Sequence, residues 1–326
     1  IRLFRKVPLY GIDWLGGAIW AIFLFSVIFL CIYGEYYDWL DSPLIRTSIV
    51  VAVVALLINI NRMFRLSRPY ISPQVFRYPH FPTVLFLFLM LCFFLTTSNV
   101  LQEMFMRSIL KYDSLNAVSI NWCVFAGIIC GSATVFYRQA IMGEGYKLLI
   151  YLGFLLLVVY ECCLYFLIHP NLNIESLYLP NFLRGIGYGI LYVCLTIYVA
   201  KSVPFEYFFQ GLCVLSFIRT SIAIPLGNSI LGRWMRYLQQ DNLGLLSRNL
   251  DNVRDWVPHV PLKQLYSEVS MQATLLSLKE LYGWICIVGT LFLLCLFAYR
   301  IWIKSWRVSH HVLRKVTNQY PEQWLS

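Results

Sequence analysis

Glu161 is the most unusual ionisable residue in this sequence. It lies in the stretch LGFLLLVVYECCLYFL, residues 152–167, in which fourteen of sixteen residues are aliphatic, aromatic or cysteine. A carboxyl group at that depth must be neutral, be paired with a cation, or carry a proton between two environments. Two interpretations stay open: a neutral Glu161 that is hydrogen-bonded to another helix or faces lipid, and a Glu161 that lines a cavity and takes part in proton coupling.

Two other charged residues invite the same question. Arg219 lies near the middle of an apolar stretch, where its charge needs a carboxylate or carbonyl groups within reach. Two roles stay open for it: a structural pair with such a partner, or a part in substrate or proton coupling. Glu103 shares a helical face with Asn99 and Gln102. That face either lines a central cavity or lies at the membrane interface near water.

Arg184 is followed by glycines at alternating positions, Gly185, Gly187 and Gly189. It lies three or four residues from the end of its predicted span, so its long side chain can reach the interface. Gly185 and Gly189 lie one turn apart, and such a small-residue face lets another helix approach closely. We therefore expect this segment to serve helix packing.

The composition defines the class of protein that must position these residues. Of 326 residues, 59% are hydrophobic and 13% are charged, and the mean hydropathy is +0.66. Soluble domains carry roughly 25% charged residues. The apolar runs approach or exceed the length of a bilayer span, whereas barrel strands are about ten residues long and alternate in polarity. The sequence therefore predicts an all-α polytopic membrane protein in contact with membrane lipid.

The cysteines and histidines suggest no reaction centre. All ten cysteines lie inside apolar runs without metal-ligand spacing, and we interpret them as reduced, small apolar residues. The five histidines fall in connecting stretches or in the tail. We expect no catalytic residues, no metal, no cofactor and no enzymatic activity.

The charges of the connecting stretches predict the orientation of the spans. One set of stretches and span edges holds fifteen Lys/Arg against four acids, the other nine against ten, and the two sets alternate along the chain. Basic loops stay in the cytoplasm, so both termini are expected there. The net charge of +10 belongs to these loops, and we expect no nucleic-acid partner. The eight predicted spans are 14–34, 44–60, 84–106, 118–137, 147–168, 181–200, 205–232 and 281–303.

Six short motifs follow one another along the chain. They are Asp13-x-x-Gly16, YGEYYDWLDSPLI, RPYISPQVFRYPHF, Arg184-Gly185-x-Gly187-x-Gly189, LSFIRTSIAIPLGNSILG around Arg219, and QATLLSLKELYGW. In this order they resemble spans seven to fourteen of the fourteen-span drug:proton antiporters of the major facilitator superfamily, EmrB/QacA type. The chain departs from that family after Arg219, where a glycine-rich stretch is reduced to Gly227.

The resemblance implies a particular domain organisation. Two linker helices are expected to precede a six-helix major-facilitator bundle, and the chain is expected to begin within a longer protein. The expected parts are a cytoplasmic lead-in at 1–13, two linker helices at 14–60, a basic cytoplasmic loop at 61–83, the bundle at 84–303 with an outer loop at 233–280, and a cytoplasmic tail at 304–326. After Pro261, that outer loop is expected to form an amphipathic helix.

The resemblance also implies a function and partners. The chain is expected to be part of a proton-coupled secondary transporter in the bacterial inner membrane, exporting small amphipathic compounds by alternating access. Its expected partners are a small-molecule substrate, an amino-terminal transporter half, a periplasmic adaptor and an outer-membrane channel. Trp234, Trp256 and Tyr266 of the outer loop are candidate anchors for the adaptor.

Two other functions stay open. A half-transporter can be a non-transporting membrane component. A membrane-embedded transferase would need clustered acidic and histidine residues at one membrane face. The outer loop offers only scattered candidates, namely Asp251, Asp255, His259 and Glu268.

Overall fold

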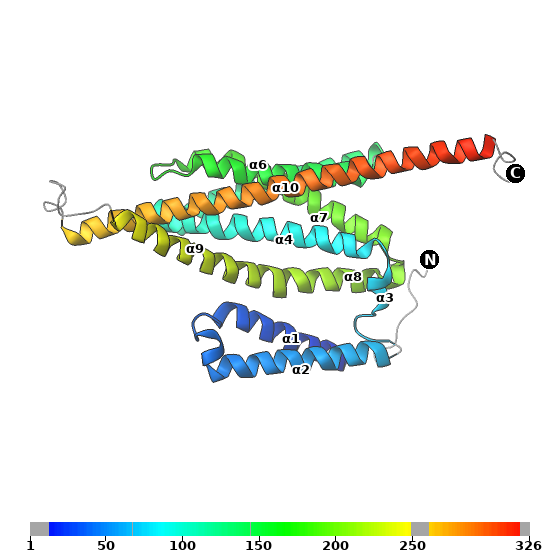
Figure 1. Cartoon of the computed structure of the whole chain (residues 1–326), viewed down its shortest axis with the longest axis horizontal. Helices are drawn as coiled ribbons and strands as arrows, with labels where there is room; N and C mark the ends of the chain where they lie inside the picture. The colour runs from blue at the N-terminus through cyan, green and yellow to red at the C-terminus, as the bar shows by residue number, and fades with distance from the viewer. Residues whose placement is uncertain (1–12, 67, 144, 249–260, 320–326) are drawn as a thin grey trace, which may run out of the picture.

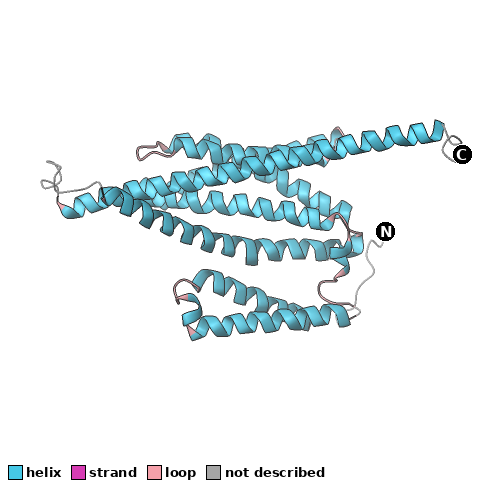
Figure 2. Cartoon of the chain, viewed as in Figure 1, coloured by secondary structure: helices cyan, strands magenta, loops and turns pink. Residues whose placement is uncertain are grey.

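The chain is an all-α polytopic membrane protein, as predicted. The computed structural model describes residues 13–66, 68–143, 145–248 and 261–319, and within these ranges every regular element is a helix (Figure 2). Eight helical segments in the described ranges are long and apolar enough to cross a membrane.

The helices follow one another with short connections. The helices of the eight spans are α1 (Trp14–Tyr33), α2 (Pro43–Arg65), α4 (Phe81–Met104), α5 (Ser114–Phe136), α6 (Tyr146–Leu167), α7 (Tyr178–Ser202), α8 (Phe205–Phe217), α9 (Ile224–Ser247) and α10 (Leu262–Gln319), and α8 and α9 together form one span. A short helix, α3 (Gln74–Arg77), precedes α4. Two short 3-10 helices are η2 (Trp39–Asp41) and η5 (Ile174–Leu177), and three π-helical turns are η3 (Phe105–Ile109), η4 (Tyr137–Ile141) and η6 (Ile218–Ala223).

One span is built from two helices joined by a π-helical turn. The turn η6 connects α8 to α9, and Pro225 occupies the first turn of α9. Proline has no amide proton and clashes with the carbonyl one turn earlier, so the widened turn lets the chain continue through this position. Such turns occur often at functional sites, and Arg219 lies in this one.

The first two helices form a hairpin beside the bundle (Figure 1). On the bundle side, α1 packs against α9 and η6. Trp20 of α1 and Tyr70 both pack against Phe217, with ring centroids 6.4 Å apart in each case. Near the opposite end of α1, Glu35 pairs with Arg236 of α9. The hairpin is therefore attached to the bundle at both of its ends.

Within the bundle, α5 and α7 approach most closely at their glycines. A Cβ atom on Gly185 of α7 would lie 2.3 Å from the carbonyl oxygen of Val124, and one on Gly189 would lie 2.6 Å from that of Ile128. Gly127 of α5 faces Gly185 in turn. The two backbones are thus nearly in contact, an arrangement that larger side chains would prevent.

The region 233–280, expected as an outer loop, is helical over most of its described part. The end of α9 and the start of α10 lie side by side and extend one end of the bundle (Figure 1). Asn242 donates to Ser277 Oγ at 3.0 Å, and Gln239 donates to Thr274 Oγ1 at 2.8 Å. We refer to residues 233–247 and 262–280 as the α9–α10 extension.

Helix α10 also continues beyond the expected last span, because no proline occurs between Leu262 and Gln319. The expected amphipathic helix, the span 281–303 and most of the expected tail therefore form one helix. Its C-terminal part projects beyond the rest of the bundle (Figure 1).

Candidate functional site

Glu161 lies completely buried in α6, with 0% of its surface exposed. Its Oε1 atom lies 2.8 Å from Ser98 Oγ and 3.2 Å from Thr97 Oγ1, both on α4. Its Oε2 atom is also buried and has no hydrogen-bond partner among the described residues. One carboxyl oxygen therefore accepts two hydrogen bonds, and the other is buried without a partner. This arrangement is costly for a permanently charged group.

The two hydroxyl groups that contact Glu161 have a second acceptor within reach. Ser98 Oγ lies 2.6 Å from the carbonyl oxygen of Phe94, and Thr97 Oγ1 lies 2.9 Å from the same atom. Each hydroxyl carries one proton and can also accept. When Glu161 is charged, both hydroxyls can donate to its Oε1 atom. When Glu161 is protonated, both can donate to the Phe94 carbonyl oxygen, and one of them can accept the single carboxyl proton. The site can thus serve both protonation states.

A second set of polar side chains lies beside this carboxyl group, and no hydrogen bond among the described residues joins the two sets. Tyr160, the neighbour of Glu161, donates its hydroxyl proton to Gln102 Oε1 at 2.5 Å. Arg184 of α7 donates through Nη2 to Asn99 Oδ1 at 2.5 Å and through Nη1 to Gln102 Oε1 at 3.3 Å. Its guanidinium lies 5.5 Å from the centre of the Tyr160 ring. We call these residues, together with Glu161, Ser98 and Thr97, the Glu161–Arg184 network.

The side chains of the network range from buried to exposed. Tyr160 and Gln102 are buried, whereas Asn99 is exposed and Arg184 is half-buried. Arg184 makes no hydrogen bond or ion pair with Glu161, but it is the cation of this network. Its positive charge favours the carboxylate, and removal from water favours the neutral acid, so the two influences oppose each other.

Close helix packing brings these residues together. On α4, the successive polar residues Thr97, Ser98 and Asn99 supply partners for α6 and α7. Gly153 of α6 and Gly187 of α7 let those helices approach: a Cβ atom on Gly187 would lie 2.9 Å from the carbonyl oxygen of Gly153. Larger residues there would separate Tyr160 and Glu161 from Arg184.

The structure brings together some of the residues singled out in the sequence and separates others. Glu161, Gln102 and Asn99 lie in one network, and Arg184, which we expected to serve packing, joins them. Glu103 does not: its side chain is 55% exposed and pairs with Arg107 at 2.6 Å, one turn along the same helix.

Arg219 lies apart from the network. Its Nη1 atom is 3.5 Å from the Tyr188 hydroxyl, and its guanidinium lies 5.5 Å from the centre of the Tyr192 ring. Gly227, further along the same span, packs against α4, because a Cβ atom there would lie 2.7 Å from Thr96 Cγ2. Gly227 is thus a packing position.

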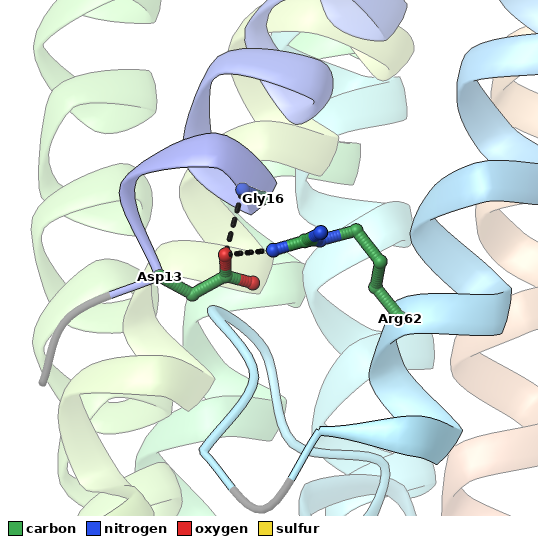
Figure 3. Close-up of polar contacts among 3 residues, drawn as sticks. All are labelled: Asp13, Gly16 and Arg62. Atoms are coloured by element: carbon green, nitrogen blue, oxygen red, sulfur yellow. Dashed lines mark hydrogen bonds and ion pairs between the residues drawn. The ribbon is translucent and has the colours of Figure 1, made fainter.

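The remaining motif residues, Asp13 and Gly16, hold the start of α1 (Figure 3). Asp13 Oδ1 accepts from the Gly16 amide at 2.9 Å and from Arg62 Nη2 of α2 at 2.5 Å. A Cβ atom on Gly16 would lie 2.2 Å from Asp13 Oδ2. Burial works to raise the pKa of Asp13, but the hydrogen bonds from Arg62 and Gly16 and the charge of Arg62 outweigh it and lower the pKa below 3.8. This pair locks the α1–α2 hairpin.

Tyr160 and Thr97 were not singled out from the sequence. The run TTSN, residues 96–99, was a usable signal for Thr97, since several hydroxyl and amide groups in one membrane span need partners on neighbouring helices. Tyr160 gave no such signal, because tyrosine is common throughout this chain. Its role depends on the rotation of α6 against α4.

No protein-family model matches this chain, and no curated protein matches its sequence. Among the described residues, the features that bear on function are the Glu161–Arg184 network and the membrane fold that encloses it.

Proposed function

We propose that the chain is part of a proton-coupled secondary transporter that exports small amphipathic compounds by alternating access. Such a protein needs an acid inside the membrane that takes up and releases a proton as the surrounding helices move. Glu161 is the residue we assign to this role. The amino-terminal half with which this bundle would form the central cavity belongs to the same proposal.

The observation that carries the proposal is the double set of partners around Glu161. Ser98 and Thr97 can stabilise the charged and the neutral carboxyl group without rearranging the backbone. A purely structural glutamic acid would need only one of these arrangements. The bare Oε2 atom also argues against a permanently charged structural pair.

Arg184 gives the proposed cycle a way to depend on conformation. Its guanidinium contacts Asn99, Gln102 and Tyr160, and it lies on a different helix from Glu161. A shift of α7 relative to α6 would change the distance between the two charges. Glu161 would release its proton when Arg184 is near and hold it when Arg184 is far. Substrate binding that favours one of these positions would then couple export to proton entry.

The decisive experiment replaces Glu161 with glutamine in the full-length protein reconstituted in proteoliposomes. Glu161→Gln keeps the size and most hydrogen bonds of the side chain but removes its titration. We expect it to abolish substrate export driven by a pH gradient and the substrate-induced proton flux, while counterflow of substrate without a gradient persists.

Glu103→Gln is the matched control, because it makes the same chemical change on an exposed carboxylate. It should retain proton-driven export at close to the wild-type rate. Wild-type export by Glu161→Gln, or equal losses in both variants, would refute the assignment of Glu161.

We further propose that both termini face the cytoplasm of a bacterial inner membrane. The support is the basic charge of the stretches at one end of the bundle and the acidic charge at the other. Single cysteines introduced into a cysteine-free protein test this. Impermeant reagents added outside should label 36–42 and 240–247 but not 62–80, and labelling of 62–80 would overturn the orientation.

The α9–α10 extension is the surface we propose for a periplasmic adaptor that leads to an outer-membrane channel. Leu245 is 50% exposed and Tyr266 is 63% exposed on it; Trp234 is 38% exposed, and Trp256 lies outside the described residues. Leu245→Glu and Tyr266→Glu should weaken co-purification of the adaptor while leaving folding unchanged. Unaltered co-purification and export in the double variant would exclude this surface.

A further inference from the structure

Arg219 differs from the other arginines that lie within the bundle. Among the described residues, its partners are the hydroxyl of Tyr188 and the ring of Tyr192, and no carboxylate lies within ion-pair distance of it. Arg184 has no ion pair among the described residues either, but it donates to the amide oxygens of Asn99 and Gln102. The positive charge of Arg219 is therefore not balanced within the described part of the chain.

The depth of Arg219 makes this imbalance costly. It follows Phe205, the first residue of α8, by fourteen positions, which is about 21 Å along a helix. A hydrocarbon core is roughly 30 Å thick, so the guanidinium lies far from the end where the span begins. Its neighbours Ser221 and Pro225 are buried, and a lone cation in such surroundings needs an anion.

The surroundings of Arg219 are nevertheless open on one side. Arg219 and Tyr188 are half-buried, and Tyr192 is 41% exposed. The rings of Tyr188 and Tyr192 lie 5.8 Å apart, so they form an aromatic wall next to the guanidinium. A ligand that bears one carboxylate and an aromatic body would pair with Arg219 and pack against this wall.

On the basis of the transport function proposed above, we propose that Arg219, Tyr188 and Tyr192 form a subsite for the anionic group of the substrate, and that the preferred substrates are amphipathic aromatic acids. The π-helical turn η6 positions the site, because it places Arg219 toward α7 just before Pro225. A lipid phosphate offers the same charge, and about 21 Å of a roughly 30 Å core leaves only about 9 Å to the opposite surface. The two tyrosine rings beside the guanidinium favour an aromatic acid over a headgroup.

Equilibrium binding to the purified full-length protein in nanodiscs tests this proposal without a proton gradient. The probes are 2-naphthoate and its neutral counterpart 2-naphthamide. We expect 2-naphthoate to bind at least about tenfold more tightly, the effect of one charge-assisted pair. Arg219→Gln should abolish this preference and Arg219→Lys should retain part of it. Arg233→Gln, the same change at an exposed position of α9, should leave it intact.

Equal binding of the two probes by the wild-type protein would overturn the proposal, and that comparison needs no folded variant. A preference that survives in Arg219→Gln would also overturn it. Nanodiscs of phosphatidylcholine and of phosphatidylglycerol separate the two sources of anion: competition by phosphatidylglycerol that requires Arg219 would assign the site to a headgroup and overturn the substrate role.

The failure of this subsite and the failure of the transport function are distinguishable. Binding of 2-naphthoate that depends on Arg219, without any proton-driven export, would refute the transport function alone. Proton-driven export of neutral compounds, with no preference between the probes, would refute the anion subsite alone.

Discussion

The contact between α5 and α7 gives the most direct test of the packing that positions Arg184. Gly185 follows Arg184, and its Cα atom lies against Gly127 of α5. Replacing Gly185 with alanine adds a single methyl group at the tightest point of this contact. Because association of membrane helices depends on close packing rather than on the hydrophobic effect, the consequence should be measurable.

The size of the effect follows from the geometry. The new Cβ atom would lie 2.3 Å from the carbonyl oxygen of Val124, about 1.1 Å short of the 3.4 Å at which ordinary contact begins. The oxygen belongs to the backbone, so it cannot move alone. A separation of the helices by about 1 Å forfeits a quarter to a half of each dispersion contact along the interface. The expected loss in the free energy of unfolding is about 1–3 kcal/mol, the usual range for overpacking.

Reversible unfolding in mixed micelles with increasing SDS, followed by circular dichroism, measures this loss. Gly244→Ala is the matched control, since no atom lies within 4 Å of a Cβ atom at that helical position. It should stabilise the protein by up to about 1 kcal/mol, because alanine favours a helix more than glycine does. Equal shifts in the two variants, or no loss in Gly185→Ala, would refute the close-contact argument.

A double variant refines the same test. Gly127→Ala should destabilise for the same reason, since its Cβ atom would lie 2.3 Å from the Phe182 carbonyl oxygen. Once one methyl group has separated the helices, the second meets less resistance. The combined loss for Gly127 and Gly185 should therefore fall short of the sum of the single losses.

Two further predictions concern polar contacts at other places in the fold. Asp13→Asn keeps a helix cap but loses the charge paired with Arg62. Because the pKa of Asp13 is lowered in the folded protein, the wild-type protein should be more stable than the variant by about 1 kcal/mol above about pH 4, and this advantage should fade as the pH falls below it. A stability difference that is the same at pH 3 and pH 7 in thermal unfolding would contradict this. Asn242→Ala removes the hydrogen bond to Ser277 and should destabilise the α9–α10 extension by about 1 kcal/mol. Amide hydrogen exchange in the extension should then be faster. Unchanged exchange would show that apolar packing alone holds the extension.

The sequence alone determined the class of fold and the most unusual residue. A chain with 59% hydrophobic and 13% charged residues has too few charged residues to cover its apolar surface in water. Its repeated apolar runs therefore predict membrane helices, whatever the arrangement of those helices. The position of Glu161 inside one such run was evident from the sequence, and the structure buries it completely. Both inferences depend on local sequence and helix geometry only.

The sequence predicted less well where one helix ends and the next begins. The sequence predicted a helix after Pro261 but not the continuation of α9 through 233–247, which is polar enough to suggest a loop and pairs with the start of α10. The π-helical turn around Arg219 likewise arises from the need to continue a span through Pro225.

Only the tertiary structure decided which charges meet. Gln102 and Glu103 are neighbours on one face of α4, yet Gln102 is buried and Glu103 is exposed, because α6 and α7 cover one side of that face. The sequence could not choose between Arg184, on the helix after that of Glu161, and Arg219, one span further along, because both lie in apolar stretches. The close glycine contacts of α7 with α5 and α6 fix the rotation of α7, and that rotation brings Arg184 into the network and leaves Arg219 beside two tyrosines.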